Sequence, residues 1–119
     1  MALSQIIDVS QSFVTGAPSS VNVDLSGWDS ATIQLVSPSG TINFLGSNDN
    51  GSITGAVEGN PTTATNFTGI QANNLLTGAA ATSGAASGLW KLIGMPKFLQ
   101  LSGTTITATK VLVYLSKIY

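Results

Sequence analysis

Apolar and polar residues alternate with a period of two along several short stretches of the chain. Residues 21–25 read Val-Asn-Val-Asp-Leu and residues 31–35 read Ala-Thr-Ile-Gln-Leu, while Ile42 and Phe44 share one face of a third stretch. This period predicts β-strands with one buried face. The intervening segment 37–40, Ser-Pro-Ser-Gly, is typical of a tight turn, so the second and third stretches are expected to form a hairpin.

Further strands are predicted in the C-terminal part of the chain, at Leu89–Ile93, Phe98–Ser102 and 106–119. The last of these is apolar on both faces, which predicts burial on two sides. No window longer than ten residues keeps a helical apolar stripe bounded by caps. Seven or eight short strands separated by turns fit an all-β fold, an antiparallel β-sandwich or jelly-roll-like barrel.

The segment Leu3–Val14 is rich in apolar and β-branched residues. It predicts either the first strand of the sheet or an arm that pairs with the sheet edge of a neighbouring subunit. We therefore divide the chain into an N-terminal strand or arm, 1–14, and a single sandwich domain, 15–119.

The pattern is weakest between residues 52 and 87. A short strand around Thr65, Phe67 and Gly69 is the one element expected there. Residues 77–88 are almost entirely Ala, Gly, Ser and Thr, which predicts a long loop that is mobile or ordered by a partner.

The composition adds a second observation, which is that the chain has few charged residues to keep its surface soluble. The chain has 119 residues, of which 43% are hydrophobic and only 8% charged, and about a quarter are charged in an ordinary soluble domain. Such a surface is poorly protected against self-association. No stretch approaches the ~20 apolar residues of a membrane-spanning helix, and the N-terminus lacks the basic region of a secretory signal. We expect neighbouring subunits to cover much of the surface.

The residue inventory excludes most catalytic chemistry. The chain has no His and no Cys, so the commonest general base and metal ligand are absent. Hydrolysis by paired carboxylates needs two acidic side chains that converge, and nothing in the sequence indicates such a pair among the five acidic residues. Residues 48–51, Asn-Asp-Asn-Gly, lack the calcium-loop pattern and predict a turn. Four lysines without an arginine cannot hold nucleic acid. We expect no enzyme, no cofactor, no metal and no nucleic-acid or membrane partner.

Two tryptophans leave an alternative open. Trp28 and Trp90 could stack on sugars, or they could pack in the core. The first reading would make the chain a carbohydrate-binding module.

The order of strands and turns from Trp28 to Tyr119 resembles small β-sandwich structural proteins of tailed bacteriophages. The similar segments are 41–51 (Thr-Ile-Asn-Phe-Leu-Gly-Ser-Asn-Asp-Asn-Gly), 88–92 (Gly-Leu-Trp-Lys-Leu), 98–102 (Phe-Leu-Gln-Leu-Ser) and the closing Val-rich strand 110–116. The loop in the first segment also resembles that of discoidin-like galactose-binding sandwiches.

The resemblance implies a non-enzymatic virion structural protein, a capsid decoration (cement) protein on the capsid surface. Its expected partners are the major capsid protein and copies of itself, as a trimer. The alternative is an adhesin module of the phage tail or fibre, which would bind glycans through Trp28, Trp90 or Tyr119. The candidate partner contacts are the apolar residues of the arm and one leucine pair: Ile6, Ile7, Phe13, Val14, Leu75 and Leu76.

Overall fold

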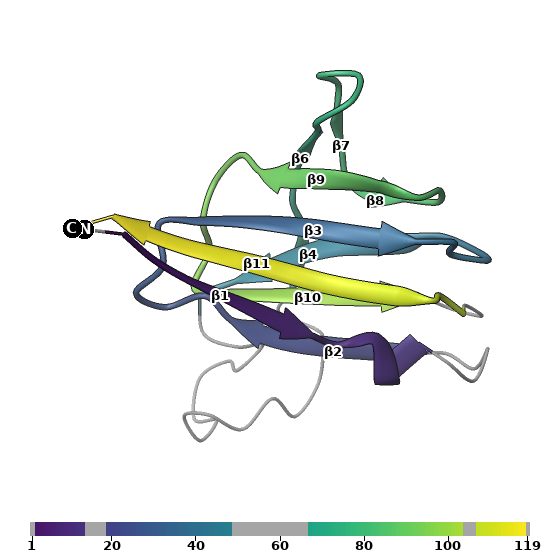
Figure 1. Cartoon of the computed structure of the whole chain (residues 1–119), viewed down its shortest axis with the longest axis horizontal. Helices are drawn as coiled ribbons and strands as arrows, with labels where there is room; N and C mark the ends of the chain where they lie inside the picture. The colour runs from purple at the N-terminus through teal and green to yellow at the C-terminus, as the bar shows by residue number, and fades with distance from the viewer. Residues whose placement is uncertain (1, 14–18, 49–66, 104–106, 119) are drawn as a thin grey trace.

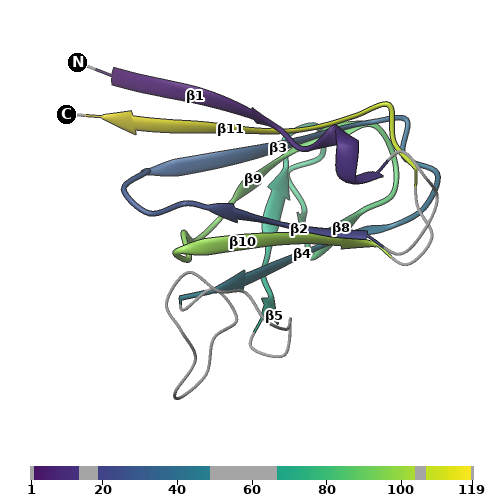
Figure 2. The same ribbon diagram turned by 90° about the horizontal axis from the view of Figure 1, so that it is seen from below.

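The computed structural model describes residues 2–13, 19–48, 67–103 and 107–118 of the chain. Two antiparallel sheets pack face to face, as the views in Figures 1 and 2 show. This arrangement confirms the predicted all-β sandwich. The elements are β1 (Ala2–Asp8), the 3₁₀ helix η1 (Ser10–Phe13), β2 (Ser19–Asp24), β3 (Ser30–Val36), β4 (Ile42–Ser47), β5 (Thr68–Gly69), β6 (Ala72–Asn74), β7 (Ala80–Ala81), β8 (Ser83–Gly84), β9 (Gly88–Leu92), β10 (Phe98–Gly103) and β11 (Lys110–Ile118).

Successive strands pass back and forth between the two layers. The six-stranded sheet, here sheet A, has the order β1-β11-β3-β9-β6-β7. Sheet B has the order β2-β10-β4-β5, with β8 also paired to β4. Four of the described strands are only two or three residues long, and these short strands raise the number above the seven or eight that periodicity predicts.

The predicted hairpin across residues 37–40 is wrong. β3 pairs with β11 and β9 in sheet A, whereas β4 pairs with β10, β5 and β8 in sheet B. The connecting segment bonds to a distant loop: Ser39 N–H donates to the carbonyl of Thr107 at 2.7 Å. Ser37 has a φ of 51°. The turn residues therefore bend the chain from one layer to the other.

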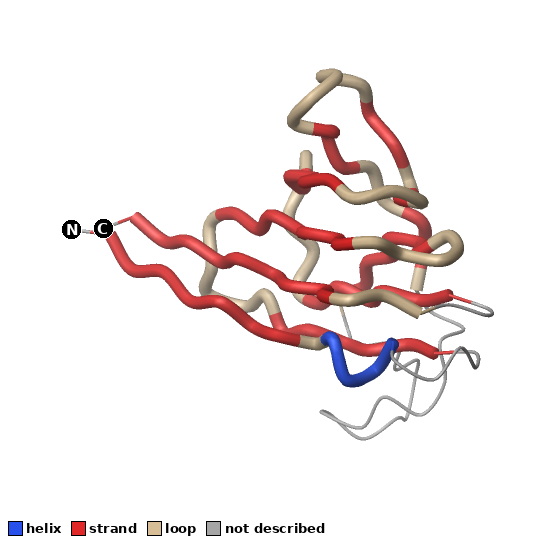
Figure 3. The backbone as a smooth tube through the Cα atoms, turned by 45° about the vertical axis from the view of Figure 1, so that its right-hand side comes forward, coloured by secondary structure: helices blue, strands red, loops and turns tan. Residues whose placement is uncertain are grey.

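The N-terminal segment is the first strand of the chain's own sheet. β1 pairs with β11 from Ala2↔Ile118 to Asp8↔Leu112. The 3₁₀ helix that follows, blue in Figure 3, brings Phe13 into the core with no exposed surface. Of the two alternatives for this segment, the structure therefore shows the strand and not the arm, and β1 is an integral part of the sandwich.

The core lies between the sheets and is built by the inward residues of the alternating strands. Ile33, Phe44 and Val113 are fully buried. Trp90 lies among them, 4% exposed, with its ring centroid 5.9 Å from that of Phe44 and the planes tilted by 58°. The short strand β8 (Ser83–Gly84), which lies against this indole, carries only small side chains.

Residues 77–88 form structure instead of the predicted long loop. β7 pairs with β6, and β8 pairs with β4. A Cβ added to Gly84 would lie 2.9 Å from both Leu35 Cδ1 and Trp90 Cζ2. Glycine is therefore required at position 84 because the backbone approaches the Trp90 ring closely.

Candidate protein-interaction surface

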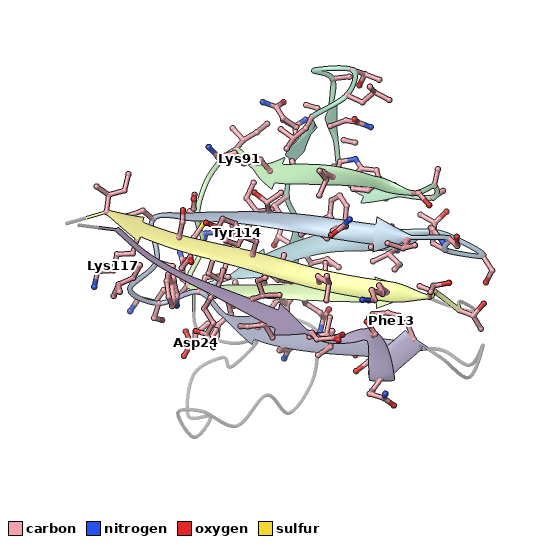
Figure 4. The ribbon with its side chains drawn as sticks, in the orientation of Figure 1. Phe13, Asp24, Lys91, Tyr114 and Lys117 are labelled. Carbon is pink, nitrogen blue, oxygen red and sulfur yellow. The ribbon has the colours of Figure 1, made fainter. Side chains whose placement is uncertain are left out.

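The outer side of sheet A carries an unusual share of the apolar residues. Across its register Ile6 lies opposite Tyr114, Tyr114 opposite Thr32, and Thr32 opposite Lys91. Tyr114 projects from the outer side of β11 in Figure 4. We define surface A as the outward residues of this sheet and its β6–β7 turn: Ser4, Ile6, Asp8, Ser30, Thr32, Gln34, Val36, Leu75, Leu76, Leu89, Lys91, Lys110, Leu112, Tyr114, Ser116 and Ile118.

The exposed large hydrophobic residues of the described chain all lie on sheet A strands or in the segments that directly follow them. On surface A, Ile6 is 64% exposed, Tyr114 44% and Ile118 75%. Leu112, between them on β11, is half-buried. The prediction that the last strand is buried on both faces is therefore wrong, because no second layer lies over its outer side in the described structure.

One end of surface A is hollowed. Leu75, Leu76 and Leu89 line a cavity of about 490 Å³ with parts of β3 and with residues 87–88. The leucine pair is held by an ordered turn, since Asn74 Oδ1 accepts hydrogen bonds from the Leu76 and Thr77 N–H groups at 2.9 and 3.3 Å. Gly78, with a φ of 77°, completes this turn. Leu76 is thereby presented to solvent, 92% exposed.

Charged groups are sparse on surface A. Lys91 and Lys110 are exposed, and Asp8 is its one carboxylate in the described residues. Asp8 Oδ1 accepts a hydrogen bond from Ser10 N–H at 2.9 Å. Hydrogen bonds from the Ser10 side chain and backbone, with a smaller contribution from Lys110, hold the pKa of the Asp8 carboxyl below its usual value.

The other carboxylates of the described residues serve the backbone. Asp24 Oδ1 accepts from Ser26 N–H at 2.8 Å, and Asp29 Oδ2 accepts from Ile118 N–H at 2.8 Å. The Asp24 bond is local and stabilises a turn, whereas the Asp29 bond ties the start of β3 to the end of β11. Within the described ranges no group of three or more metal-ligating side chains comes together.

The candidate partner residues divide into three groups. Ile6, Leu75 and Leu76 lie exposed on surface A, whereas Ile7 faces inward and is partly buried against the core. Phe13 needs correction: it is a core residue because η1 turns its ring between the sheets. The remaining candidate, Val14, lies outside the described residues.

Sequence reasoning missed several apolar residues of the same surface. Leu89, Leu112, Tyr114 and Ile118 belong to it. Leu112, Tyr114 and Ile118 could have been identified from the sequence, because the last strand has apolar residues on both of its faces. A strand with two apolar faces is compatible with an outer face that another molecule covers, as well as with burial of both faces inside one chain.

The aromatic residues considered for sugar stacking lie in different environments. Trp90 is buried in the core, which is the second of the two alternatives given for it. Trp28 is half-buried and packs against the core, and Tyr119 lies outside the described residues. In the segment 48–51, Asn48 Oδ1 accepts a hydrogen bond from Lys97 N–H at 3.2 Å, and the rest lies outside the described residues.

The fold and this surface define the chain as a β-sandwich with one apolar outer face. Comparison with solved structures finds a similar chain, the SPBc2 prophage-derived protein YomS. Its crystal structure superposes with a TM-score of 0.71 at 13% sequence identity, over 98% of this chain and 96% of YomS. At this identity the similarity establishes a shared fold. No protein-family model matches the sequence, and no curated protein matches it. No helix of the described residues has the length and hydropathy to span a membrane.

Proposed function

We propose that this chain is a non-catalytic structural protein of a bacteriophage particle, and that it decorates the capsid by docking surface A onto capsid subunits. The observation that carries this proposal is the concentration of exposed apolar residues on one sheet. Contiguous exposed apolar surface marks sites of protein contact. Charged residues make up only 8% of the whole chain, and three of them, Asp8, Lys91 and Lys110, lie on this surface.

The fold comparison supports the same direction. YomS is prophage-derived and matches over nearly its whole length. A phage-derived protein can therefore consist of this sandwich fold alone. The absence of His and Cys from the sequence fits a protein whose work is contact, since it removes the commonest catalytic groups. Its partners on this proposal are the major capsid protein and further copies of the chain.

The first experiment asks whether the chain belongs to particles at all. Particles produced from the genome that encodes it are purified on a density gradient and analysed by quantitative mass spectrometry. We expect the chain in intact heads at a copy number comparable with that of the major capsid protein. Its absence from purified particles would overturn the proposal, and presence only in isolated tails would favour the adhesin reading, which a glycan array then tests.

The second experiment locates the docking face. Particles from a deletion strain are mixed with the wild type, with Tyr114→Asp on surface A, or with Asn43→Asp on the outer side of sheet B. Both positions are exposed on a strand and both variants add one negative charge. We expect Tyr114→Asp alone to lose binding while it remains folded, with only a small drop in melting temperature because the side chain is exposed. Equal binding of all three proteins would show that surface A is not the docking face.

A further inference from the structure

The outer edge of β1 is a second unpaired feature, distinct from surface A. β1 stands at the end of the strand order of sheet A, and no other described strand pairs with its far side. Figure 2 looks onto this side of the sandwich and shows β1 running along it from the N-terminus to η1. Its seven residues are long for an unprotected edge strand, because natural edges are commonly short, charged or interrupted by proline.

The hydrogen-bond register identifies which backbone groups are free on this edge. Val9 N–H donates to the carbonyl of Val111 at 2.9 Å, directly after the last β1 pair. Because hydrogen-bonded pairs alternate in antiparallel ladders, the odd-numbered residues of β1 bond to β11. The N–H and C=O groups of Ser4 and Ile6 therefore point away from the sheet, available to another strand.

The other edges of the sandwich are less suited to strand addition. At the far end of sheet A, β7 has two residues, and in sheet B β5 also has two. β2 is six residues long, but its outward side chains are polar: Ser20, Asn22 and Asp24. On its outward side β1 carries Ile6, 64% exposed, between Ser4 and Asp8, and on its other side Leu3 is 43% exposed.

We propose that β1 is a self-association edge, on which β1 of a second copy pairs antiparallel about a two-fold axis through Gln5. This axis aligns the full length of both strands, since Gln5 is the midpoint of Ala2–Asp8. Ser4 then forms hydrogen-bonded pairs with Ile6 of the second copy through the free edge groups. The two sheets A join into one continuous sheet.

Side chains agree with this register. Leu3, 43% exposed, meets Ile7 of the second copy in a non-hydrogen-bonded pair, where side chains lie closest. The two Asp8 carboxylates lie at opposite ends of the paired strands, so the register opposes no like charges. Since a two-fold axis perpendicular to the sheet keeps each face on its own side, both copies of surface A face the same way.

Cysteine cross-linking tests the register directly, because the natural chain contains no cysteine. In Gln5→Cys the two thiols are opposite each other at the axis, with Cα atoms about 4.5 Å apart, within disulfide range. In the control Ser4→Cys the two Cα atoms are about 8 Å apart, beyond that range. We expect rapid formation of a covalent dimer by Gln5→Cys and at least tenfold slower formation by Ser4→Cys. Equal rates, or the reverse order, would overturn the proposed axis.

Charge exchange at the same residue tests the dimer without a covalent bond. Analytical ultracentrifugation over a concentration series should give a wild-type dimer, and Gln5→Lys and Gln5→Glu should each weaken dimerisation at least tenfold. An equimolar mixture of the two variants should restore the dimer, because opposite charges then meet at the axis. A wild-type monomer or trimer, or variants that dimerise as the wild type does, would overturn the inference. These measurements use isolated protein, so they stand or fall independently of particle binding.

Discussion

The outer faces of the two sheets differ, although the inner faces are alike. Both sheets alternate, and both send fully buried residues inward, such as Val113 from sheet A and Leu101 from sheet B. Outside, sheet A presents Ile6, Tyr114 and Ile118, whereas the exposed residues on the described strands of sheet B are polar or glycine (Ser20, Asp24, Asn43, Thr68 and Gly69). The fold requires one apolar face per sheet, so the second apolar face of sheet A needs another explanation.

Sheet B also shows how a polar outer face is built. Gln100, opposite both Asn22 and Leu45, is only 5% exposed, and its Nε2 donates to Asn22 Oδ1 at 3.1 Å. A buried amide is thus satisfied within its own chain. On sheet A the corresponding central position is held by Tyr114, whose ring remains 44% exposed. This difference between the two outer faces is the one expected if surface A docks onto a partner, as we propose.

The largest effect we predict separates the two faces of one strand. Leu115, fully buried on the inner face of β11, is replaced by Ala, and we expect a loss of about 2–5 kcal/mol in the free energy of unfolding, from lost transfer energy and a cavity. Its neighbour Tyr114→Ser should lose less than about 1 kcal/mol, the value of a cross-strand pair. Urea denaturation measures both. If Tyr114→Ser cost as much as Leu115→Ala, the apolar outer face would be needed for folding and the comparison would fail.

The next effect concerns close packing in two-residue strands. Gly84→Ala would place its Cβ against the rigid Trp90 ring and the Leu35 side chain, and overpacking of this kind costs about 1–3 kcal/mol. Gly69→Ala is the matched control, because its added Cβ would have no atom within 4 Å and should change stability by less than about 0.5 kcal/mol. Thermal melts compare the two variants. Equal stabilities would show that the glycine at 84 is not required by the packing of Trp90.

A third prediction changes surface hydrophobicity with almost no change in stability. Leu76 is 92% exposed, so Leu76→Ser should alter the free energy of unfolding by less than about 0.5 kcal/mol. It should, however, shorten retention on a hydrophobic-interaction column, because it removes apolar area from surface A. Asn43→Ser on sheet B is the control and should leave retention unchanged. Equal retention of wild type and Leu76→Ser would mean that the hollow at this end does not contribute to the exposed apolar surface.

Most of the strands could be predicted from the sequence because alternation reports a local property, the burial of one face. Residues 21–24 lie in β2, with Leu25 directly after it, and residues 31–35 lie in β3; the predicted C-terminal strands correspond to β9, β10 and β11. Pairing could not be predicted in the same way. Ser39 bonds to Thr107, far along the chain, and turn chemistry at residues 37–40 is equally compatible with a hairpin and with a crossing between sheets.

The candidate surface was only partly predictable for a related reason. Ile6, Leu75 and Leu76 could be identified as apolar residues in weakly patterned segments, and they do lie on surface A. Phe13 has the same character in the sequence but lies in the core, since exposure depends on where η1 ends relative to both sheets. Residues 77–88 were misread because small side chains, typical of loops, also permit strands to pack over an indole.

The smallest predicted effect concerns the one carboxylate on surface A. Hydrogen bonds from Ser10 hold the pKa of the Asp8 carboxyl below its ordinary value of 3.8. A lowered pKa means that the ionised form stabilises the folded state, so this contribution is complete above pH 3.8 and is lost as the pH falls through the folded-state pKa. The melting-temperature difference between wild type and Asp8→Asn should therefore be small near neutral pH and vanish in acid. A difference that stayed constant with pH would show that the junction of β1 and η1 does not depend on this charge.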